Sequence, residues 1–207
     1  MDSAKFWDAM AEAYDGYAMK KYAQAYTDTV MLSRKYLKKD DAVLDFACGT
    51  GLTTVQLAGD VQSVHAVDIS PKMLAVAQRK CGSEGIQNVR FDCATLFDER
   101  LRESAYDVVL AFNVLFALPR QDRVFIRIGA LLKPGGMFIS ATDCLAESGL
   151  KYRLGIWLMA RLGKVPYEKL YTTESLKAAV RTGGFEMIEA CSLYEAPPNL
   201  FIAARKA

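Results

Sequence analysis

Residues 43–51 read VLDFACGTG, an apolar run that passes directly into a glycine-rich turn, and a helical pattern starts near residue 51. Glycine at such a turn lets the backbone approach a ligand closely, and the start of the next helix directs free amide groups toward that ligand. A G-x-G pair is weak on its own, because many tight turns contain glycine. The segment predicts a ligand site only if the rest of the chain builds a parallel sheet around it.

The remaining sequence supplies that sheet, because short apolar or β-branched runs alternate with helical patterns from about residue 41 onward. Strands are expected at 42–47, 63–68, 88–93, 106–112, 137–142, 185–194 and 200–204, and helices near 51–59, 71–80, 121–132 and 173–182. The turn at Pro197 and Pro198 is short enough for a hairpin. These features predict an α/β fold with about seven strands, mostly parallel, with helices on both faces and an antiparallel edge strand.

Two segments fall outside this alternation. Residues 1–40 have the pattern of two helices, and residues 143–172 form a long insertion between the fifth strand and the last helix. A chain of 207 residues is long enough for one substantial core. We therefore expect a single domain, 1–207, in which these two segments are additions to the sheet.

Charge and cysteine content exclude several kinds of protein. The 26 Lys and Arg nearly balance the 24 Asp and Glu, so nucleic acid is not expected as a partner. The five cysteines show no C-x-x-C spacing, which indicates reduced thiols and no metal site. The start of the chain lacks the apolar run of a signal peptide, and no stretch approaches the ~20 apolar residues that cross a bilayer. A cytoplasmic protein without a metal is expected.

Asp68 indicates the kind of ligand that the glycine turn could hold. It ends the strand 63–68 and lies 17 residues after Gly51, near the spacing of about 20 residues at which an acid binds the hydroxyls of a ribose. A dinucleotide fingerprint would have a third glycine where Thr54 stands, which disfavours NAD(P). Asp45 would repel a pyrophosphate but suits a ligand with an ammonium and a sulfonium group, such as S-adenosylmethionine (SAM).

Three motifs in this order, VLDFACGTG, AVDISPKMLAVA and LLKPGGMFI, resemble those of the class I SAM-dependent methyltransferases, including small-molecule enzymes of the ubiquinone and menaquinone type. The resemblance covers residues 41–142, and the ending GGFEMIEACSLYEAPPNLFIAARK is similar to the last helix and hairpin of that family. It implies a Rossmann-like fold, SAM as the cofactor with S-adenosylhomocysteine (SAH) as its product, and a small-molecule acceptor that the motifs do not specify.

The resemblance also implies which residues surround SAM. The glycine turn would surround the methionine moiety, the acid after it would bind the ribose, and the start of the next helix would lie against the adenine. The end of the fourth strand would face the methyl group, because ligands of open α/β sheets bind at the carboxyl ends of strands. The expected cofactor-binding residues are Tyr14, Asp45, Phe46, Ala47, Cys48, Gly49, Gly51, Asp68, Ile69, Met73, Thr95, Leu96, Phe112 and Asn113.

The adenine contact has two alternatives. The residue after the third strand is commonly an Asp in this family, and alignment from Asn88 places Thr95 at that position. The Thr95 hydroxyl could accept one hydrogen bond, with the Leu96 amide beside it. Asp92 is a competing alignment.

Several other side chains allow a functional or a structural interpretation. His65 is the only histidine, lies inside the second strand and is expected to be structural. Tyr14 and Asp15 would belong to a lid formed by residues 1–40, or form a surface pair. Asp143 could be a general base or a solvated loop carboxylate, so no catalytic residue is assigned. Aromatic residues of the N-terminal segment would pack the helices or line an acceptor pocket, and these are Trp7, Tyr17, Tyr22 and Tyr26.

The insertion 143–172 combines basic and apolar side chains. Its basic residues are Lys151, Arg153, Arg161 and Lys164, and its apolar stripe includes Leu154, Trp157, Leu158 and Leu162. Such a segment can cap an active site or lie on an anionic membrane surface. The cap is favoured, and membrane contact is the alternative.

The sequence thus predicts an enzyme that transfers a methyl group from SAM to a small molecule, with an apolar or lipid-like acceptor as one candidate. Transfer from a sulfonium needs alignment and exclusion of water more than it needs a base. Two alternatives are an NAD(P)-binding oxidoreductase and a SAM-binding protein without transfer activity.

Overall fold

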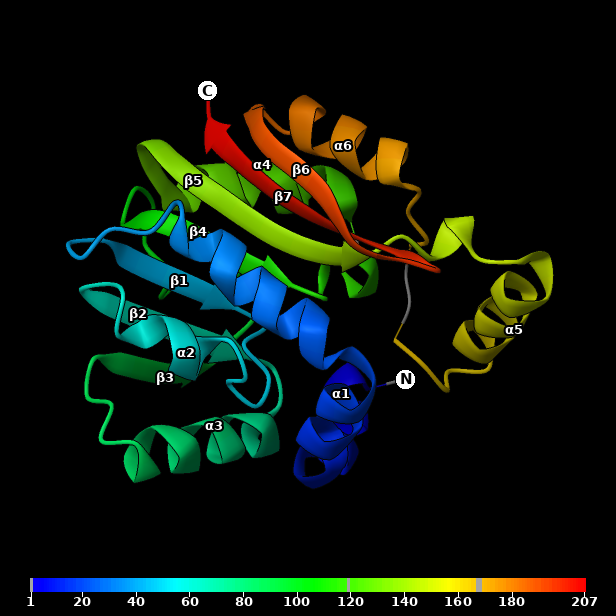
Figure 1. Cartoon of the computed structure of the whole chain (residues 1–207), viewed down its shortest axis with the longest axis horizontal. Helices are drawn as coiled ribbons and strands as arrows, with labels where there is room; N and C mark the ends of the chain where they lie inside the picture. Colours follow the sequence, from blue (N-terminus) through cyan, green and yellow to red (C-terminus); the bar gives the residue numbers. More distant parts are fainter. Residues whose placement is uncertain (1, 119, 167–168) are drawn as a thin grey trace.

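The seven expected strands form one mixed sheet in the order β3-β2-β1-β4-β5-β7-β6 (Figure 1). The computed structural model describes residues 2–118, 120–166 and 169–207. The strands are β1 Ala42–Phe46, β2 Ser63–Asp68, β3 Val89–Cys93, β4 Tyr106–Phe112, β5 Leu132–Asp143, β6 Phe185–Glu195 and β7 Pro198–Lys206. β1 to β5 pair in parallel, whereas β7 is antiparallel to both β5 and β6. The predicted sheet is therefore confirmed, with the β6–β7 hairpin at one edge.

Helices cover both faces of this sheet, as predicted. They are α1 Ser3–Arg34, α2 Thr54–Ala58, α3 Pro71–Ser83, α4 Gln121–Leu131, α5 Leu150–Arg161 and α6 Thr173–Thr182. One face buries Leu44 and Val109 against α4 and α6, and the other buries Val43 and Val108 against α2, α3 and the second half of α1. Successive strand residues point to opposite faces, which is why the central strands are apolar throughout. Within the described ranges, no helix is long and apolar enough to cross a membrane.

The N-terminal segment forms α1, which bends at Tyr22, where the backbone has φ −130° and ψ 18°. Its second half packs on the sheet through Val30. Its first half extends past the sheet toward α3, where Ala11 packs with Met73 and Val76 (Figure 1). The two helices predicted within 1–40 correspond to the two halves on either side of this bend.

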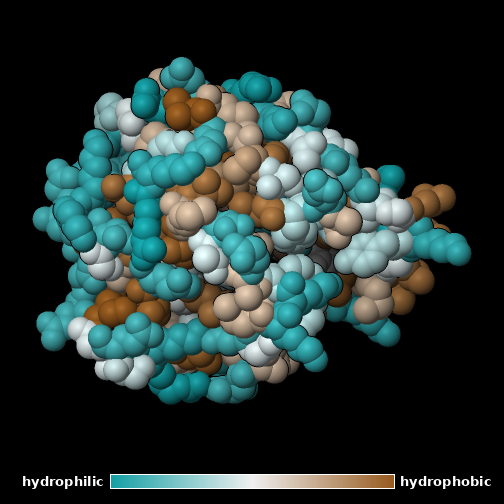
Figure 2. Space-filling view, viewed as in Figure 1, coloured by the Kyte–Doolittle hydropathy of each residue, from teal (hydrophilic) through white to brown (hydrophobic). Residues whose placement is uncertain are grey.

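The insertion contains α5, which projects from the body of the molecule (Figure 1). None of its residues is buried, and Leu150, Leu154 and Trp157 are 77%, 61% and 52% exposed. Figure 2 shows apolar side chains on this projecting part. Among the described residues that follow α5 in the insertion, Val165 and Pro166 line cavities at the sheet edge, which are described below. The cap predicted for 143–172 stays a prediction, and its residues 167 and 168 lie outside the described residues.

Candidate active site

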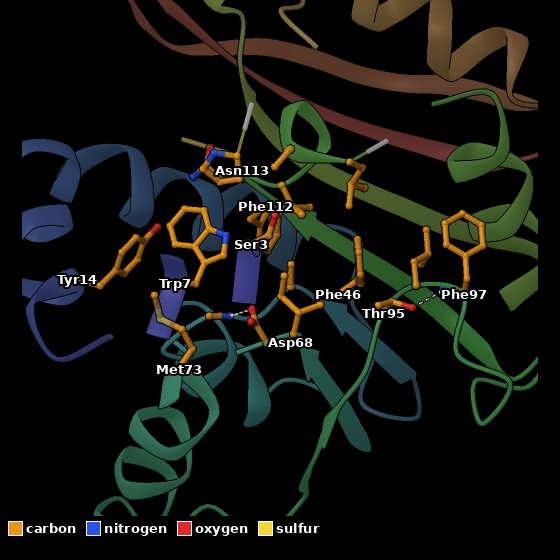
Figure 3. A pocket seen from close by; sticks show the side chains of 18 residues that line it. Ser3, Trp7, Tyr14, Phe46, Asp68, Met73, Thr95, Phe97, Phe112 and Asn113 are labelled. Atoms are coloured by element: carbon orange, nitrogen blue, oxygen red, sulfur yellow. Dashed lines mark hydrogen bonds between the residues drawn. The ribbon is translucent and has the colours of Figure 1, made fainter. Parts of the chain in front are cut away.

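A cavity of about 290 Å³ lies at the carboxyl ends of β1, β2 and β4, with the first half of α1 along one side (Figure 3). We call it the first cavity. Eleven of the fourteen residues expected around a cofactor line it, and these are Tyr14, Phe46, Ala47, Gly49, Asp68, Ile69, Met73, Thr95, Leu96, Phe112 and Asn113. Asp45 and Cys48 line a small adjoining pocket, which shares Ala47 and Gly49 of the glycine turn with the first cavity. Gly51 instead faces α3.

The turn after β1 takes a backbone conformation that favours glycine. Ala47, Gly49 and Gly51 have φ values of 57°, 56° and 75°. A Cβ atom on Gly51 would lie 3.0 Å from the Cβ of Ala77 in α3. Gly51 therefore lets α3 pack closely against the turn. At Gly49, by contrast, an added Cβ atom would have no neighbour within 4 Å.

Asp68, at the end of β2, is bonded to the turn and to the next helix. Its Oδ2 accepts a hydrogen bond from the Gly49 amide at 2.9 Å, and its Oδ1 accepts one from the Ser70 amide at 2.8 Å. Burial raises the pKa of this carboxyl, and the backbone amides partly offset that effect. A carboxylate oxygen can accept two hydrogen bonds. Each oxygen of Asp68 can therefore accept a second one from a hydroxyl in the cavity.

Asp45 is a buried acid in β1, only 1% exposed. It accepts a hydrogen bond of 2.5 Å from the hydroxyl of Thr54, the residue that occupies the position of a third glycine. Burial raises the pKa of Asp45 to about 7; the Thr54 bond opposes this rise, and the charge of Asp68 adds to it. A cation brought close to Asp45 would favour the ionised carboxylate, because opposite charges attract strongly where water is excluded.

The two alternatives for the residue after β3 lie in different environments. Thr95 lines the first cavity on the side away from α1 (Figure 3). Asp92 bonds to the His65 ring at 2.8 Å and pairs with Arg90 at 2.5 Å, and it is absent from the described lining of the cavity. The other ring nitrogen of His65 bonds to the Tyr106 hydroxyl at 2.7 Å. Thr95 is the one placed to meet a ligand, and His65 joins three strands as a structural residue would.

Acidic residues attach the first half of α1 to the cavity's edge. Asp8 accepts a hydrogen bond of 2.6 Å from the Ser70 hydroxyl, and this bond holds the pKa of Asp8 below its usual value. Asp15 accepts a 2.5 Å bond from the Thr50 hydroxyl in the glycine turn and pairs with Lys80 of α3. These contacts hold α1 beside the turn, so that Trp7 and Tyr14 form part of the cavity wall.

A second cavity of about 230 Å³ adjoins the first. The two share Trp7, Tyr14, Phe112, Asn113 and Pro166 as lining residues. Aromatic rings dominate its walls, and the rings are Phe6, Trp7, Tyr14, Tyr17, Tyr22, Tyr26, Phe112, Phe116 and Tyr194. The four aromatic residues singled out in the N-terminal segment thus all face this cavity, while Tyr14 and Tyr26 also bond to each other at 3.1 Å.

Polar side chains gather at one side of the second cavity. Asp143, at the end of β5, accepts hydrogen bonds from the Tyr194 hydroxyl and, at 2.6 Å, from Asn199 Nδ2. The same Asn199 nitrogen donates to Asn113 Oδ1 at 2.9 Å. Tyr194 and Asn199 carry no local sequence signal, because the β6–β7 hairpin brings them to β5 only after long-range antiparallel pairing.

An outer groove of about 670 Å³ continues from the second cavity toward the foot of α5. Tyr22, Ala25, Asp143 and Tyr194 line both spaces. The Tyr22 and Tyr194 rings stack there with centroids 5.6 Å apart and an interplanar angle of 24°. The three spaces therefore adjoin one another from the groove to the glycine turn.

Comparison with known proteins agrees with this geometry. Residues 43–136 match the sequence profile of a family described as a methyltransferase domain. The chain is 28% identical over 162 residues to a ubiquinone biosynthesis O-methyltransferase of Nitrosococcus oceani, covering 75% of this chain and 67% of that protein. It is 30% identical over 138 residues to a malonyl-acyl-carrier-protein O-methyltransferase of Halalkalibacterium halodurans, covering 64% of this chain and 51% of that protein.

Among solved structures, the fold resembles geranyl diphosphate C-methyltransferase of Streptomyces coelicolor A3(2), solved with Mg²⁺, geranyl diphosphate and SAH. The TM-score is 0.77 at 14% identity, covering 100% of this chain and 97% of that one. At this identity the likeness concerns the fold. The chain spans between a half and two thirds of the length of the two curated relatives named above.

Proposed function

Because the chain belongs to the class I SAM-dependent methyltransferases, we propose that it transfers a methyl group from SAM to a small apolar molecule. SAM would bind in the first cavity and the acceptor in the second. The proposal rests most on one observation, which is that the two cavities share the wall formed by Phe112 and Asn113 at the end of β4. Ligands bound in the two cavities would meet at that wall.

The residues of the first cavity fit SAM. Each oxygen of Asp68 can accept a hydrogen bond from a ribose hydroxyl in addition to the one that it accepts from a backbone amide. Ile69, Met73 and Leu96 offer apolar surface to the adenine, with the Thr95 hydroxyl beside them. Asp45, in the small adjoining pocket, would attract the ammonium group of the methionine moiety. A pyrophosphate would meet two acids at this turn, which disfavours a dinucleotide.

SAM supplies a methyl group that is already activated by its positive sulfur. The protein's part is then to align the acceptor and to keep water out. The aromatic walls of the second cavity suit a flat or elongated apolar acceptor, and the outer groove gives such a molecule a way in. Curated relatives include an enzyme of ubiquinone biosynthesis, which supports a lipid-like acceptor as one candidate.

Titration calorimetry with SAM and SAH tests the assignment. Replacing Asp68→Ala should weaken binding of both by about 10- to 100-fold, since hydrogen bonds to a charged group contribute roughly 1.5–3 kcal/mol. The matched control is Asp60→Ala, which removes an acid paired with Arg34 outside the cavity. Unchanged affinity in the Asp68 variant would refute the site assignment.

A second measurement separates the alternatives. SAH release from SAM with small hydroxyl, amine or thiol acceptors would support transfer. SAM binding without SAH release in that panel would favour a binding protein without transfer activity. Cofactor fluorescence reports binding of NAD(P)H. An oxidoreductase would be favoured if NAD(P)H binds and SAM does not.

A further inference from the structure

The carboxylate of Asp143 is held in one orientation by donors on a single oxygen. The Tyr194 hydroxyl and Asn199 Nδ2 both donate to Oδ1. Among the described residues, Oδ2 takes no hydrogen bond and no Lys, Arg or His pairs with Asp143. The side chain lines both the second cavity and the outer groove. One oxygen of a fixed carboxylate is thus available to whatever occupies these spaces.

The residue that fixes Asp143 also reaches the wall between the two cavities. Asn199 is 2% exposed, and its Nδ2 uses its two hydrogens on Asp143 Oδ1 and Asn113 Oδ1. Its own Oδ1 is buried and has no hydrogen-bond partner in the described part of the chain. Asn113 has φ 53° and lines both cavities. Asn199 therefore ties the carboxylate to the place where methyl donor and acceptor would meet.

A carboxylate with one free oxygen in an aromatic cavity favours ligands that carry a hydrogen-bond donor. A molecule with a hydroxyl or N–H at the reacting end can donate to the free oxygen, whereas an ether or plain hydrocarbon leaves it unsatisfied. A carboxylate lying within hydrogen-bond reach of such a group can also take its proton. The aromatic walls accept the remaining apolar part of the molecule.

We propose that Asp143 is the catalytic proton acceptor and that the methyl group goes to an oxygen or nitrogen that carries a proton, an inference that rests on the proposed function. The heteroatom gives its proton to Oδ2 of Asp143, and its electron pair forms the bond to the methyl carbon. The carbon–sulfur bond breaks with its pair on sulfur, which becomes the neutral thioether of SAH. The proton then leaves Asp143 for water through the groove. Asn199 and Tyr194 act as positioning residues.

Binding provides the first test. SAH-loaded protein is titrated with 4-ethylphenol and with its methyl ether, 4-ethylanisole, which lacks the donor. The phenol should bind at least about 10-fold more tightly, and Asp143→Asn should reduce that preference several-fold. Equal binding of the two probes to the unaltered protein would overturn the proposal. Absence of SAH binding itself would instead overturn the proposed function, so the two failures are distinguishable.

Turnover provides the second test, through the acidity of the acceptor. With SAM present, Asp143→Asn should lower kcat for 4-ethylphenol by about 100-fold or more. For 4-nitrophenol, which is ionised near neutral pH and needs no base, the loss should be below about 10-fold. A merely structural role would reduce turnover of both probes alike, and that result would contradict the inference. So would SAM binding without SAH release from either phenol.

Two further variants complete the design. Glu186→Gln makes the same chemical change on β6, outside the cavities, and should leave turnover of both phenols unchanged. If Asp143→Asn fails to bind SAH, Tyr194→Phe decides, because it keeps the ring and removes one donor from Oδ1. It should lower kcat for 4-ethylphenol several-fold while sparing 4-nitrophenol, and equal losses would refute the role of Asp143.

Discussion

The Gly49 amide donates a 2.9 Å hydrogen bond to Oδ2 of Asp68, which joins the turn after β1 to the end of β2. The other oxygen of Asp68 accepts from the Ser70 amide at the start of α3. Asp68 thus organises the protein's own backbone in addition to offering lone pairs to a ligand. The structural role of this side chain and its proposed binding role can be measured separately.

Replacing Asp68→Asn should destabilise the ligand-free protein by about 1–3 kcal/mol. The amide has one oxygen, so its NH₂ group would face either the Gly49 or the Ser70 amide and leave a buried donor unsatisfied. Urea unfolding without ligand measures this loss. Asp60→Asn is the control, because its exposed pair with Arg34 should contribute less than about 1 kcal/mol. Equal stability of the Asp68 variant and the unaltered protein would show that the backbone bonds do not depend on the carboxylate.

Gly51→Ala should lower stability by about 1–3 kcal/mol. The residue has φ 75°, which strains any side chain, and its Cβ atom would lie 3.0 Å from that of Ala77. Gly59→Ala is the matched comparison, since Gly59 has φ −68° and nothing within 4 Å of an added Cβ. Thermal unfolding should show a clear drop in Tm for the first variant and little change for the second. Similar Tm values for the two variants would mean that α3 can move away from the turn without a loss of stability.

The elements that the sequence alone predicts are those whose causes are local. The helix expected near 71–80 is α3, and the Ser70 side chain before it accepts a hydrogen bond from the Met73 amide as a helix cap. The hydrophobic runs of β1, β2 and β4 are buried on both faces, so their pattern is visible in the residues themselves. The same locality explains why the glycine turn and Asp68 could be placed at one site.

The second cavity could not be predicted from local sequence patterns. Its polar group depends on Asn199 and Tyr194, which meet Asp143 only through the pairing of β5 with β7 and of β7 with β6. The bend of α1 at Tyr22 likewise has no proline or glycine beside it, and it coincides with the ring stack on Tyr194. Long-range packing, which no local pattern encodes, decides which aromatic residues line the second cavity.

The attachment of α1 to the glycine turn should control how long SAM stays bound. Asp15→Asn weakens the pair with Lys80 and changes the bond from the Thr50 hydroxyl, so the first half of α1 should open more often. We expect SAM to dissociate several-fold faster, measured by stopped-flow displacement with excess SAH. Glu12→Gln is the control on the same helix, because Glu12 and Arg79 are 77% and 61% exposed and should contribute little. Identical dissociation rates for both variants would argue against a lid.

Asp45 should make the ligand-free protein less stable as the pH rises. Burial raises the pKa of Asp45 from 3.8 to about 7 in the folded chain. At pH values between 3.8 and about 7 the folded state therefore binds more protons than the unfolded state. Stability then falls as pH rises from about 4 and levels off above about 7. Asp45→Asn lacks this titration, and its stability relative to the unaltered protein should increase by roughly 4 kcal/mol across that window. Urea unfolding at pH 5 and pH 8 checks the sign, and a difference independent of pH would contradict it.

The same acid predicts that SAM binding releases protons near neutral pH. Because burial raises the pKa of Asp45 to about 7, part of the Asp45 carboxyls carry a proton near neutral pH. An ammonium group held near Asp45 stabilises the carboxylate and lowers that pKa, so binding should release a fraction of a proton per SAM. Calorimetry in phosphate and in Tris, which differ in ionisation enthalpy, measures the release as a difference in apparent binding enthalpy. Asp45→Asn should abolish the difference. Equal enthalpies in both buffers for the unaltered protein would place the ammonium group away from Asp45.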